Sequence, residues 1–323
     1  MLSILGVGAA YPETIIDNSF LAELSDSRWA KELEERLGIL KRRSSLTTDY
    51  IRQSKNHTPR SVRAEISPSV LGLQAAEKAI ERAGIQKEQI GLILGDSGTP
   101  LETTPAEAQR LGALLGLKIN AYDIAMGAGA LLGQLDVLCS MKPESLPEYI
   151  LCVSTNCLTQ KVDYAEGDER FIFGDGACAF IASAKHTGKL GVHYSAFARG
   201  ESRADPVVVP SFGHISGAAI DEDGVYQECV DAITQLSKVV SGVGGSYLVG
   251  PQLSNTILAR VSEEFGIPSD RVLGNLEERG NTLGSSAMSV VAEHWDALRH
   301  GDQLVVVDVG LSLNRSSAVF RVM

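Results

Sequence analysis

The first feature that could carry chemistry is a run of small residues that joins a predicted strand to a predicted helix, residues 122–132, YDIAMGAGALL. A strand that runs straight into a buried helix places one side chain at the helix N-terminus, at the bottom of a cavity. A cysteine there would have its thiol pKa lowered by the helix dipole and would be a ready nucleophile. This chain has Ala128 at that position.

The cysteines predict reduced thiols rather than disulfides or a metal site. Their number, five, is odd, and no secretory signal precedes them: Cys139, Cys152, Cys157, Cys178 and Cys229. Cys152 and Cys157 form a C-x4-C pair with no second Cys or His pair nearby, whereas zinc sites need four ligands. We therefore expect neither a metal nor a resident cofactor.

A basic segment, residues 41–63, departs from the charge of the rest of the chain. Its seven Lys and Arg residues against the single acid Asp49 give a local charge of +6, whereas 29 basic and 40 acidic residues give the whole chain −11. Ser, Thr, Asn and Pro are frequent here, which predicts an exposed loop. Two interpretations stay open: a solvated basic face, or a docking surface for an acidic carrier protein or nucleotide phosphates.

Short aliphatic runs alternate with longer amphipathic stretches, which is the pattern of a layered α/β protein. The predicted strands cover residues 3–7, 90–95, 121–125, 149–154, 177–183, 191–198, 247–249 and 303–309. The predicted helices cover residues 69–83, 106–115, 127–141, 228–240, 253–265 and 285–298. Helix 69–83 is expected to bury a stripe made of Leu73, Ala76, Ile80 and Ala83. Helix 127–141 is apolar on nearly every side, so we expect it in the middle of the molecule.

Two glycine motifs are interpreted as turns. Residues 6–10, GVGAA, are followed by Tyr11 and Pro12, which spoil the phosphate-binding turn of a dinucleotide fingerprint. Residues 173–177, FGDGA, predict a tight turn in which Asp175 bonds its own backbone. We expect both motifs to be structural.

Length and composition set the class of protein. The chain has 323 residues, 44% hydrophobic and 21% charged, which indicates a globular protein of one large domain or two fused halves. The elements of residues 1–185 are loosely repeated in residues 186–323, so we predict two packed halves with this boundary. The net negative charge argues against nucleic acid as a partner. No apolar run approaches the roughly 20 residues of a membrane span, and no basic export signal opens the chain, so we expect a cytoplasmic protein.

Taken together, eight segments resemble β-ketoacyl-ACP synthase III, the initiating condensing enzyme of the thiolase fold. They run in order along essentially the whole chain: ILGVGAAYPE, DSRWAKELEERLGI, AAEKAIERAGI, AYDIAMGAGALLG, IFGDGACAFIAS, SYLVGPQ, RGNTLGSSAMSV and DVGLSLNRSSAVF. The resemblance implies a thiolase-like α/β fold, with two packed βαβαβ-type halves in a five-layer α/β/α/β/α arrangement. It also implies a dimer.

In the resembled family a cysteine takes the acyl group from a thioester, and a histidine and an asparagine stabilise the enolate formed by decarboxylation. Carried over position by position, the cysteine falls on Ala128, the histidine on Pro251 and the asparagine on Asn281. The family's C-terminal glycine run becomes Gly310, Leu311 and Ser312. Only the asparagine is retained, so the resemblance implies inactive nucleophile and histidine positions.

The sizes of these losses matter. Removing one oxyanion donor costs about 10²- to 10³-fold in rate, and proline has neither a ring proton nor a backbone N–H to replace the histidine. The methyl group of Ala128 cannot form an acyl-enzyme at all. Because Pro251 and the altered glycine run accompany Ala128, natural degeneracy explains the pattern better than one engineered substitution.

Candidate CoA-binding residues are Trp29, which falls near where the family stacks a tryptophan on the adenine, and Arg43 of the basic segment. The position that is arginine in the family is Thr256 here. His214 lies in a loop that the family places near the substrate entrance, and we expect it at a partly exposed surface position. Other nucleophile types near matched motifs are expected to be structural: Ser254, Thr282, Ser285, Ser286 and Cys178.

Three functional hypotheses follow. The first is a non-condensing subunit, in a homodimer or paired with an active Cys-bearing ketosynthase of fatty-acid or polyketide-type biosynthesis, visited by an acyl carrier protein. The second is an acyltransferase or thioester-processing enzyme that acts on acyl-CoA or acyl-carrier-protein substrates without a Cys acyl-enzyme, using Asn281 and backbone amides. The third is a binding module that holds an acyl thioester or free acid in the pocket beside Ala128.

Overall fold

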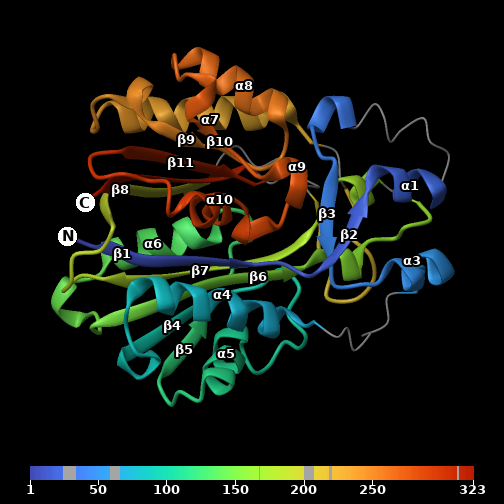
Figure 1. Ribbon diagram of the computed structural model, residues 1–323, viewed down its shortest axis with the longest axis horizontal. Helices are drawn as coiled ribbons and strands as arrows, with labels where there is room; N and C mark the ends of the chain where they lie inside the picture. The colour runs from blue at the N-terminus through green and yellow to red at the C-terminus, as the bar shows by residue number, and fades with distance from the viewer. Residues whose placement is uncertain (25–33, 59–65, 167, 200–206, 218–219, 311–312) are drawn as a thin grey trace.

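Helices and strands stack in five alternating layers (Figure 1). The computed structural model describes residues 1–24, 34–58, 66–166, 168–199, 207–217, 220–310 and 313–323. Two pairs of helices form the outer layers, and one pair lies between the two halves of the sheet. These helices are α4 (Pro68–Ala83) and α5 (Glu107–Leu115), α7 (Glu222–Ser237) and α8 (Asn255–Glu264), and the central α6 (Ala130–Ser140) and α10 (Ser286–His294). The predicted α/β/α/β/α arrangement is confirmed.

The strands form one ten-stranded sheet in the order β10-β9-β11-β12-β8-β1-β7-β6-β4-β5. One half contains β1 (Ser3–Ala10), β4 (Ile90–Asp96), β5 (Asn120–Asp123), β6 (Tyr149–Cys157) and β7 (Asp175–Ser183). The other contains β8 (Leu190–Arg199), β9 (Tyr247–Val249), β10 (Val272–Leu273), β11 (Gln303–Val309) and β12 (Asn314–Val322).

The two halves of the sheet share one topology. From the centre outward, each half places its first, fifth, fourth, second and third strands in that order, and β1 meets β8 in antiparallel pairing at Ser3–Gly191 and Ile4–Leu190. This shared order is what the loose sequence repeat would produce. The division of the chain into two domains at residue 185 stays a prediction.

The central helix α6 is buried, as its composition predicts. Its apolar residues pack with those of α10 and both halves of the sheet in one core, which includes Leu131, Leu135 and Val290. The helix begins at Ala130 rather than at residue 127, because Gly127 and Gly129 have positive φ angles of 70° and 75°. Those angles lie outside the helical region and are open to glycine at little cost.

Helix α4 buries only part of the predicted stripe. Ala76 is fully buried, as are Leu71, Ala75 and Ala79, whereas Leu73, Ile80 and Ala83 are only half-buried. The small residues face β1, where a Cβ on Gly6 or Gly8 would collide with the α4 backbone. The predicted turn at residues 6–10 is therefore wrong: both glycines lie inside a strand and permit the helix to approach it closely.

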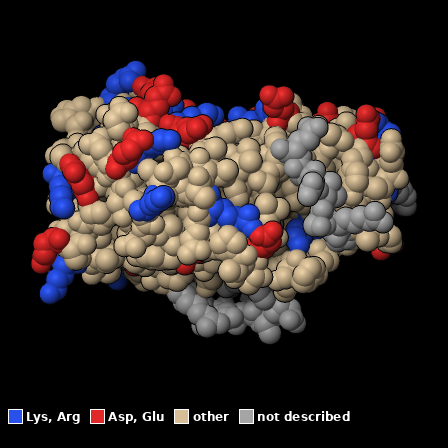
Figure 2. Space-filling model, turned by 90° about the horizontal axis from the view of Figure 1, so that it is seen from below, with Lys and Arg blue, Asp and Glu red and all other residues tan. Residues whose placement is uncertain are grey.

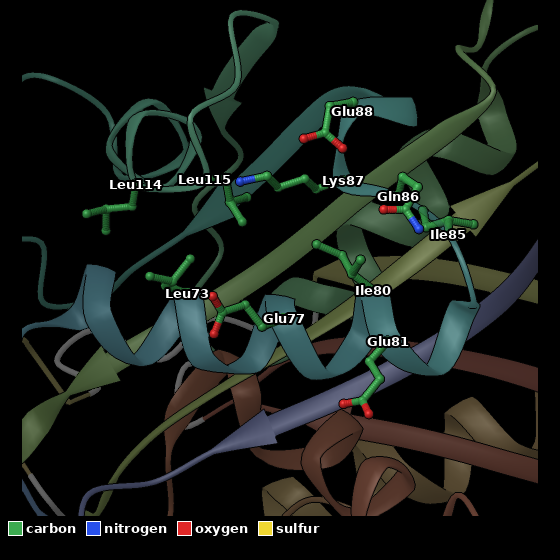
Figure 3. Close-up of a pocket in the computed structure, with 10 residues that line it drawn as sticks. All are labelled: Leu73, Glu77, Ile80, Glu81, Ile85, Gln86, Lys87, Glu88, Leu114 and Leu115. Atoms are coloured by element: carbon green, nitrogen blue, oxygen red, sulfur yellow. The ribbon is translucent and has the colours of Figure 1, made fainter.

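Leu73 and Ile80 instead point into a cavity of about 320 Å³ between α4 and α5 (Figure 3). Leu114 and Leu115 of α5 line its other side, and charged residues such as Glu77 stand at its border. None of its lining residues belongs to the segments around Ala128, so this cavity is not the candidate site.

A smaller unit caps one end of the layers (Figure 1). It contains a two-stranded sheet and short helices: β2 (Thr14–Asp17), β3 (Lys41–Ser44), α1 (Asn18–Leu24), α3 (Thr48–Ser54) and α9 (Leu276–Arg279).

The predicted turn at residues 173–177 is also wrong, because Asp175 is the first residue of β7. Its buried carboxylate accepts hydrogen bonds from the backbone and hydroxyl groups of Ser45 and Thr159, and so joins the cap to the sheet.

The basic segment is not the exposed loop that its composition predicts. Residues 41–44 form β3 and residues 48–54 form α3, while residues 59–65 lie outside the described part of the chain. Arg42 is 1% exposed and donates to the Ile16 and Phe171 carbonyls and to the side chain of Asn18. Because buried carbonyls accept hydrogen bonds from this guanidinium, Arg42 belongs to the core of the cap rather than to a docking surface.

Within the described residues, no helix is long and apolar enough to cross a membrane.

Candidate functional site

Ala128 occupies the junction that the sequence predicts, between the end of β5 at Asp123 and the start of α6 at Ala130. Ala128 is half-buried, whereas Gly129 and Ala130 behind it are buried. A Cβ on Gly129 would collide with the Ser316 hydroxyl, so the segment is pressed against β12. The junction thus carries the Ala128 methyl group, and its assignment to the nucleophile position stays a prediction.

The loop that carries Asn281 lies against this junction. A Cβ on Gly284, three residues later, would collide with the Gly127 carbonyl and the side chains of Asp96 and Ser154. Asn281 itself is 4% exposed. Its Nδ2 donates to the Gln252 carbonyl at 2.8 Å, and its Oδ1 accepts the backbone N–H of Leu283 at 2.9 Å. The side-chain amide therefore fastens two loops together.

Pro251 is buried and follows the end of β9 at Val249. The next residue, Gln252, is the one that accepts from Asn281. The side chain of Gln252 accepts the backbone N–H groups of Asn275 and Leu276, at 3.0 and 3.2 Å. The structure thus connects the segments of all three positions that the family resemblance singles out, and a hydrogen bond directly links two of these segments.

Sequence reasoning misses two carboxylates beside Ala128. Asp96, at the end of β4, accepts the backbone N–H of Met126 at 3.0 Å and that of Gly127 at 3.4 Å. Asp308, in β11, accepts the backbone N–H of Gly129 at 2.9 Å. Both residues lie in strands far from residue 128 in the sequence. The available signal is an aspartate at or near the end of each of two otherwise apolar strands.

Both carboxylates are almost completely buried, with 1% and 3% of their surface exposed. Burial raises the pKa of Asp96 to about 6, although hydrogen bonds from Ser154, Met126 and Gly127 lower it in part. Burial raises the pKa of Asp308 to about 7 against the hydrogen bonds it accepts. In the described residues neither carboxylate forms an ion pair, so these groups titrate near neutral pH without a cation to hold them ionised.

Of the two predicted CoA-binding residues, the structure describes only Arg43. Trp29 lies outside the described residues. Arg43 lies on β3 and donates to the Pro12 and Glu13 carbonyls at 3.4 and 3.1 Å, and burial is the main cause that lowers its pKa. Thr256, near the start of α8, donates to the Arg36 carbonyl. CoA binding by Trp29 and Arg43 stays a prediction.

The other nucleophile types occupy hydrogen-bonded or buried positions. The hydroxyl of Ser285 donates to Thr282, and the hydroxyl of Ser286 accepts the Thr282 backbone N–H. Burial raises the pKa of the Cys178 thiol, which disfavours a thiolate. His214 is half-buried, and its Nε2 lies 2.7 Å from the Asn56 carbonyl.

Two family models match the chain in order. 3-Oxoacyl-[acyl-carrier-protein] synthase III matches residues 122–198, and its C-terminal counterpart matches residues 246–322. The β-ketoacyl-[acyl-carrier-protein] synthase III of Chlamydia caviae is 25% identical over 99% of this chain and 96% of its own length. That of Rhizorhabdus wittichii is 26% identical, with 98% of both chains covered.

Solved structures share the fold over the whole chain. The Aquifex aeolicus 3-oxoacyl-[acyl-carrier-protein] synthase III superposes with a TM-score of 0.86 at 20% identity, over 99% of this chain and 100% of that one. A priming β-ketosynthase from the R1128 polyketide pathway gives a TM-score of 0.81 at 20% identity, over 100% of this chain and 96% of that one.

The superposition and the strand order show that the chain has the thiolase-like fold of these structures. The ordered family matches and the full-length relatives show that the chain is similar to ketosynthase III proteins along its whole length.

Proposed function

We propose that this chain is a non-condensing, ketosynthase-III-like subunit that works beside an active, Cys-bearing ketosynthase in fatty-acid or polyketide-type biosynthesis. One observation carries the proposal: a methyl group, that of Ala128, stands at the strand-to-helix junction where the family fold would hold its nucleophile. A methyl group forms no acyl-enzyme, so the two-step transfer of a condensing enzyme has no first intermediate in this chain.

The histidine position supports the same conclusion. Pro251 offers no side-chain hydrogen-bond donor and no backbone N–H, so it supplies nothing to a thioester oxygen. A chain that has lost both groups retains the scaffold without the chemistry. Its contribution to a pathway would then come from its surfaces and from its effect on a partner.

The alternative function, acyl transfer without an acyl-enzyme, depends on Asn281. That amide already donates to Gln252 and accepts from Leu283, and it is 4% exposed. Because these contacts engage both ends of the amide, its role in the fold is accounted for without a substrate. The geometry therefore favours the non-condensing subunit over direct transfer.

The surface around β5 supports pairing with another subunit. β5 is the last strand of the sheet and pairs with β4 alone among the described strands, so its outer edge offers unpaired backbone groups. Tyr122 on β5 is 45% exposed, and Leu114 on α5, the helix that packs on β5, is 49% exposed. Seen from the side of α5, much of the surface carries no charged side chains (Figure 2). An unpaired edge beside exposed apolar residues favours dimerisation.

The partner in this proposal is either an active homologue or a second copy of this chain, and the homologue is the one that explains retention of a non-condensing scaffold. An acidic acyl carrier protein would visit the exposed part of the basic segment. Lys41 there is paired with Glu278 at 3.0 Å and Arg52 with Glu23 at 3.3 Å, and both pairs are solvent-exposed. Exposed pairs of this kind are weak and exchange readily with another carboxylate.

The test is co-expression of the tagged chain with each ketosynthase III homologue of its own host, followed by size-exclusion chromatography and an assay of condensation. We expect a 1:1 complex and condensation activity that requires the partner's cysteine. Leu114→Glu and Tyr122→Glu should dissociate the complex. Val239→Glu is the matched control, because Val239 is 64% exposed beyond the end of α7, in the opposite outer layer. No complex with any homologue, together with unchanged pathway activity on deletion of the gene, would refute the proposal.

A further inference from the structure

Buried carboxylates hold the backbone on both sides of Ala128. Asp96 accepts the N–H groups of Met126 and Gly127, the two residues before Ala128, and Asp308 accepts the N–H of Gly129 after it. Asp96 comes from β4 and Asp308 from β11, so the two halves of the sheet each supply one acid to the same short segment.

The surroundings of these carboxylates are polar but not cationic. The Ser154 hydroxyl donates to Asp96 at 2.7 Å, and the charged neighbour that acts on Asp96 is another carboxylate, Asp123. On the other side, the Ser316 hydroxyl is buried, has no hydrogen-bond partner among the described residues, and lies against Gly129. Negative charge near residue 128 is therefore not neutralised by a described Lys, Arg or His.

This arrangement is the reverse of what acyl transfer requires. When a nucleophile at a strand-to-helix turn attacks a thioester, the carbonyl oxygen becomes negative and needs hydrogen-bond donors, which backbone N–H groups beside the nucleophile can supply. In this chain the N–H of Gly129, the residue after position 128, is already bound to Asp308. A carboxylate at this place takes the donor and also repels a thiolate, an oxyanion or an enolate.

We propose that Asp308, assisted by Asp96, is an internal anion that occupies the backbone donor beside position 128 and excludes the anionic species of condensation from this site. The inference deepens the proposed non-condensing role and rests on it. It states that the loss of the nucleophile is built into the surroundings of residue 128, so that restoring a cysteine alone would not restore a reactive thiolate.

The experiment measures the thiol pKa of a cysteine placed at position 128. The variants are Ala128→Cys alone and combined with Asp308→Asn, Asp308→Ala or Asp96→Asn. Each is treated with iodoacetamide across pH 6–10, the thiolate displaces iodide to form a thioether, and labelling is read by peptide mass spectrometry. Cys139, on the same α6 helix and exposed, is the internal reference for reagent and pH. Asp136→Asn is the matched control, because Asp136 lies on α6 and acts on Ser195 and Cys139 instead of the junction; in this variant the labelling curve of Cys139 itself should shift, and the reference is the Cys139 curve of the Ala128→Cys protein.

We expect the introduced cysteine to have a pKa above the ordinary value of about 8.5, and Asp308→Asn to lower it by at least about one unit, that is, roughly tenfold faster labelling near pH 8, where the Asp308 carboxyl is ionised. Asp96→Asn should act in the same direction, and Asp136→Asn should leave the curve of the introduced thiol unchanged. Equal labelling curves for Ala128→Cys with and without Asp308 would overturn the inference. Asp308→Ala serves if the asparagine variant fails to fold, and thermal unfolding of each variant identifies such a failure.

The outcome is separable from that of the proposed function. A chain that forms no complex with any ketosynthase could still show the pKa shift, because the shift needs only this chain. If the chain pairs with a ketosynthase but the thiol pKa at position 128 does not shift, the subunit function stands and the proposal that Asp308 is an internal anion fails.

Discussion

The carboxylate of Asp308 accepts the backbone N–H of Gly129 at 2.9 Å, across 179 positions of sequence. The bond joins β11, in one half of the sheet, to the residue before α6, which belongs to the other half. This buried hydrogen bond thus connects the two halves of the sheet beside Ala128.

This carboxylate should make stability depend on pH. Burial raises the Asp308 pKa from 3.8 to about 7, so between these values the folded chain keeps a proton that the unfolded chain releases. Because the unfolded chain releases this proton and the folded chain keeps it, the free energy of unfolding falls as pH rises from about 4 to about 7. Asp308→Asn should gain stability relative to the wild type across that window, by at most about 4 kcal/mol. Urea unfolding at pH 5 and pH 8 measures it, and a constant difference between the two proteins would contradict it.

The close approach of β1 to α4 predicts an asymmetric pair of glycine variants. A Cβ on Gly8 would collide with the backbone of α4 at Ala75 and Ala79, so Gly8→Ala should cost at least about 2 kcal/mol. Gly72→Ala is the control: it lies inside α4, its Cβ would meet side chains at 3.6 Å, and it should stabilise by about 0.5–1 kcal/mol. Denaturant unfolding measures the free energy of unfolding of both variants. Similar changes in Gly8→Ala and Gly72→Ala would contradict the close approach of β1 to α4.

The ion pair between Arg315 of β12 and Glu228 of α7 should matter more than surface pairs do. Its atoms are 2.7 Å apart, and the two side chains are only 15% and 11% exposed. Glu228→Gln leaves the guanidinium with Asp231 at 3.6 Å, and we expect a loss of about 2 kcal/mol. Asp49→Asn, which breaks the exposed pair with Arg52, should cost less than about 0.5 kcal/mol. Thermal unfolding measures the stability lost in each variant, and equal losses in Glu228→Gln and Asp49→Asn would contradict the larger contribution of the buried pair.

Asn281→Ala should act on stability rather than on chemistry. The variant loses two buried hydrogen bonds, to Gln252 and from Leu283, and we expect a cost of about 1–3 kcal/mol. Thioester turnover by the isolated chain should be absent before and after the substitution. Turnover by the wild type that Asn281→Ala abolishes without a change in melting temperature would instead revive direct acyl transfer.

The sequence predicts the long elements well and the short ones poorly. The apolar helix α6 and the eight predicted strands are all present, because their periodicity and burial agree. The pattern does not reveal β12, because the polar run Asn314, Arg315, Ser316 and Ser317 at its start hides the face that the strand buries. Helix α7 begins six residues before its predicted start at residue 228, because acidic residues occupy its first turn before the apolar pattern begins.

The site is predictable where it depends on one segment and not where it depends on pairing. Ala128 can be placed at the start of a buried helix from local sequence alone. Asp96 and Asp308 cannot be assigned to it, because only the order of strands in the sheet brings them to the same backbone. The basic segment misleads for a related reason: Arg42 lies within a basic run, but carbonyls contributed by distant segments bury it.

Native mass spectrometry of the tagged chain, purified from its own host at low salt to preserve weak charged contacts, decides whether this chain is a non-condensing subunit. We expect a heterodimer with a Cys-bearing ketosynthase, in which acyl groups are found on the partner's cysteine and never on this chain. A homodimer that turns over acyl thioesters without any other protein would contradict it.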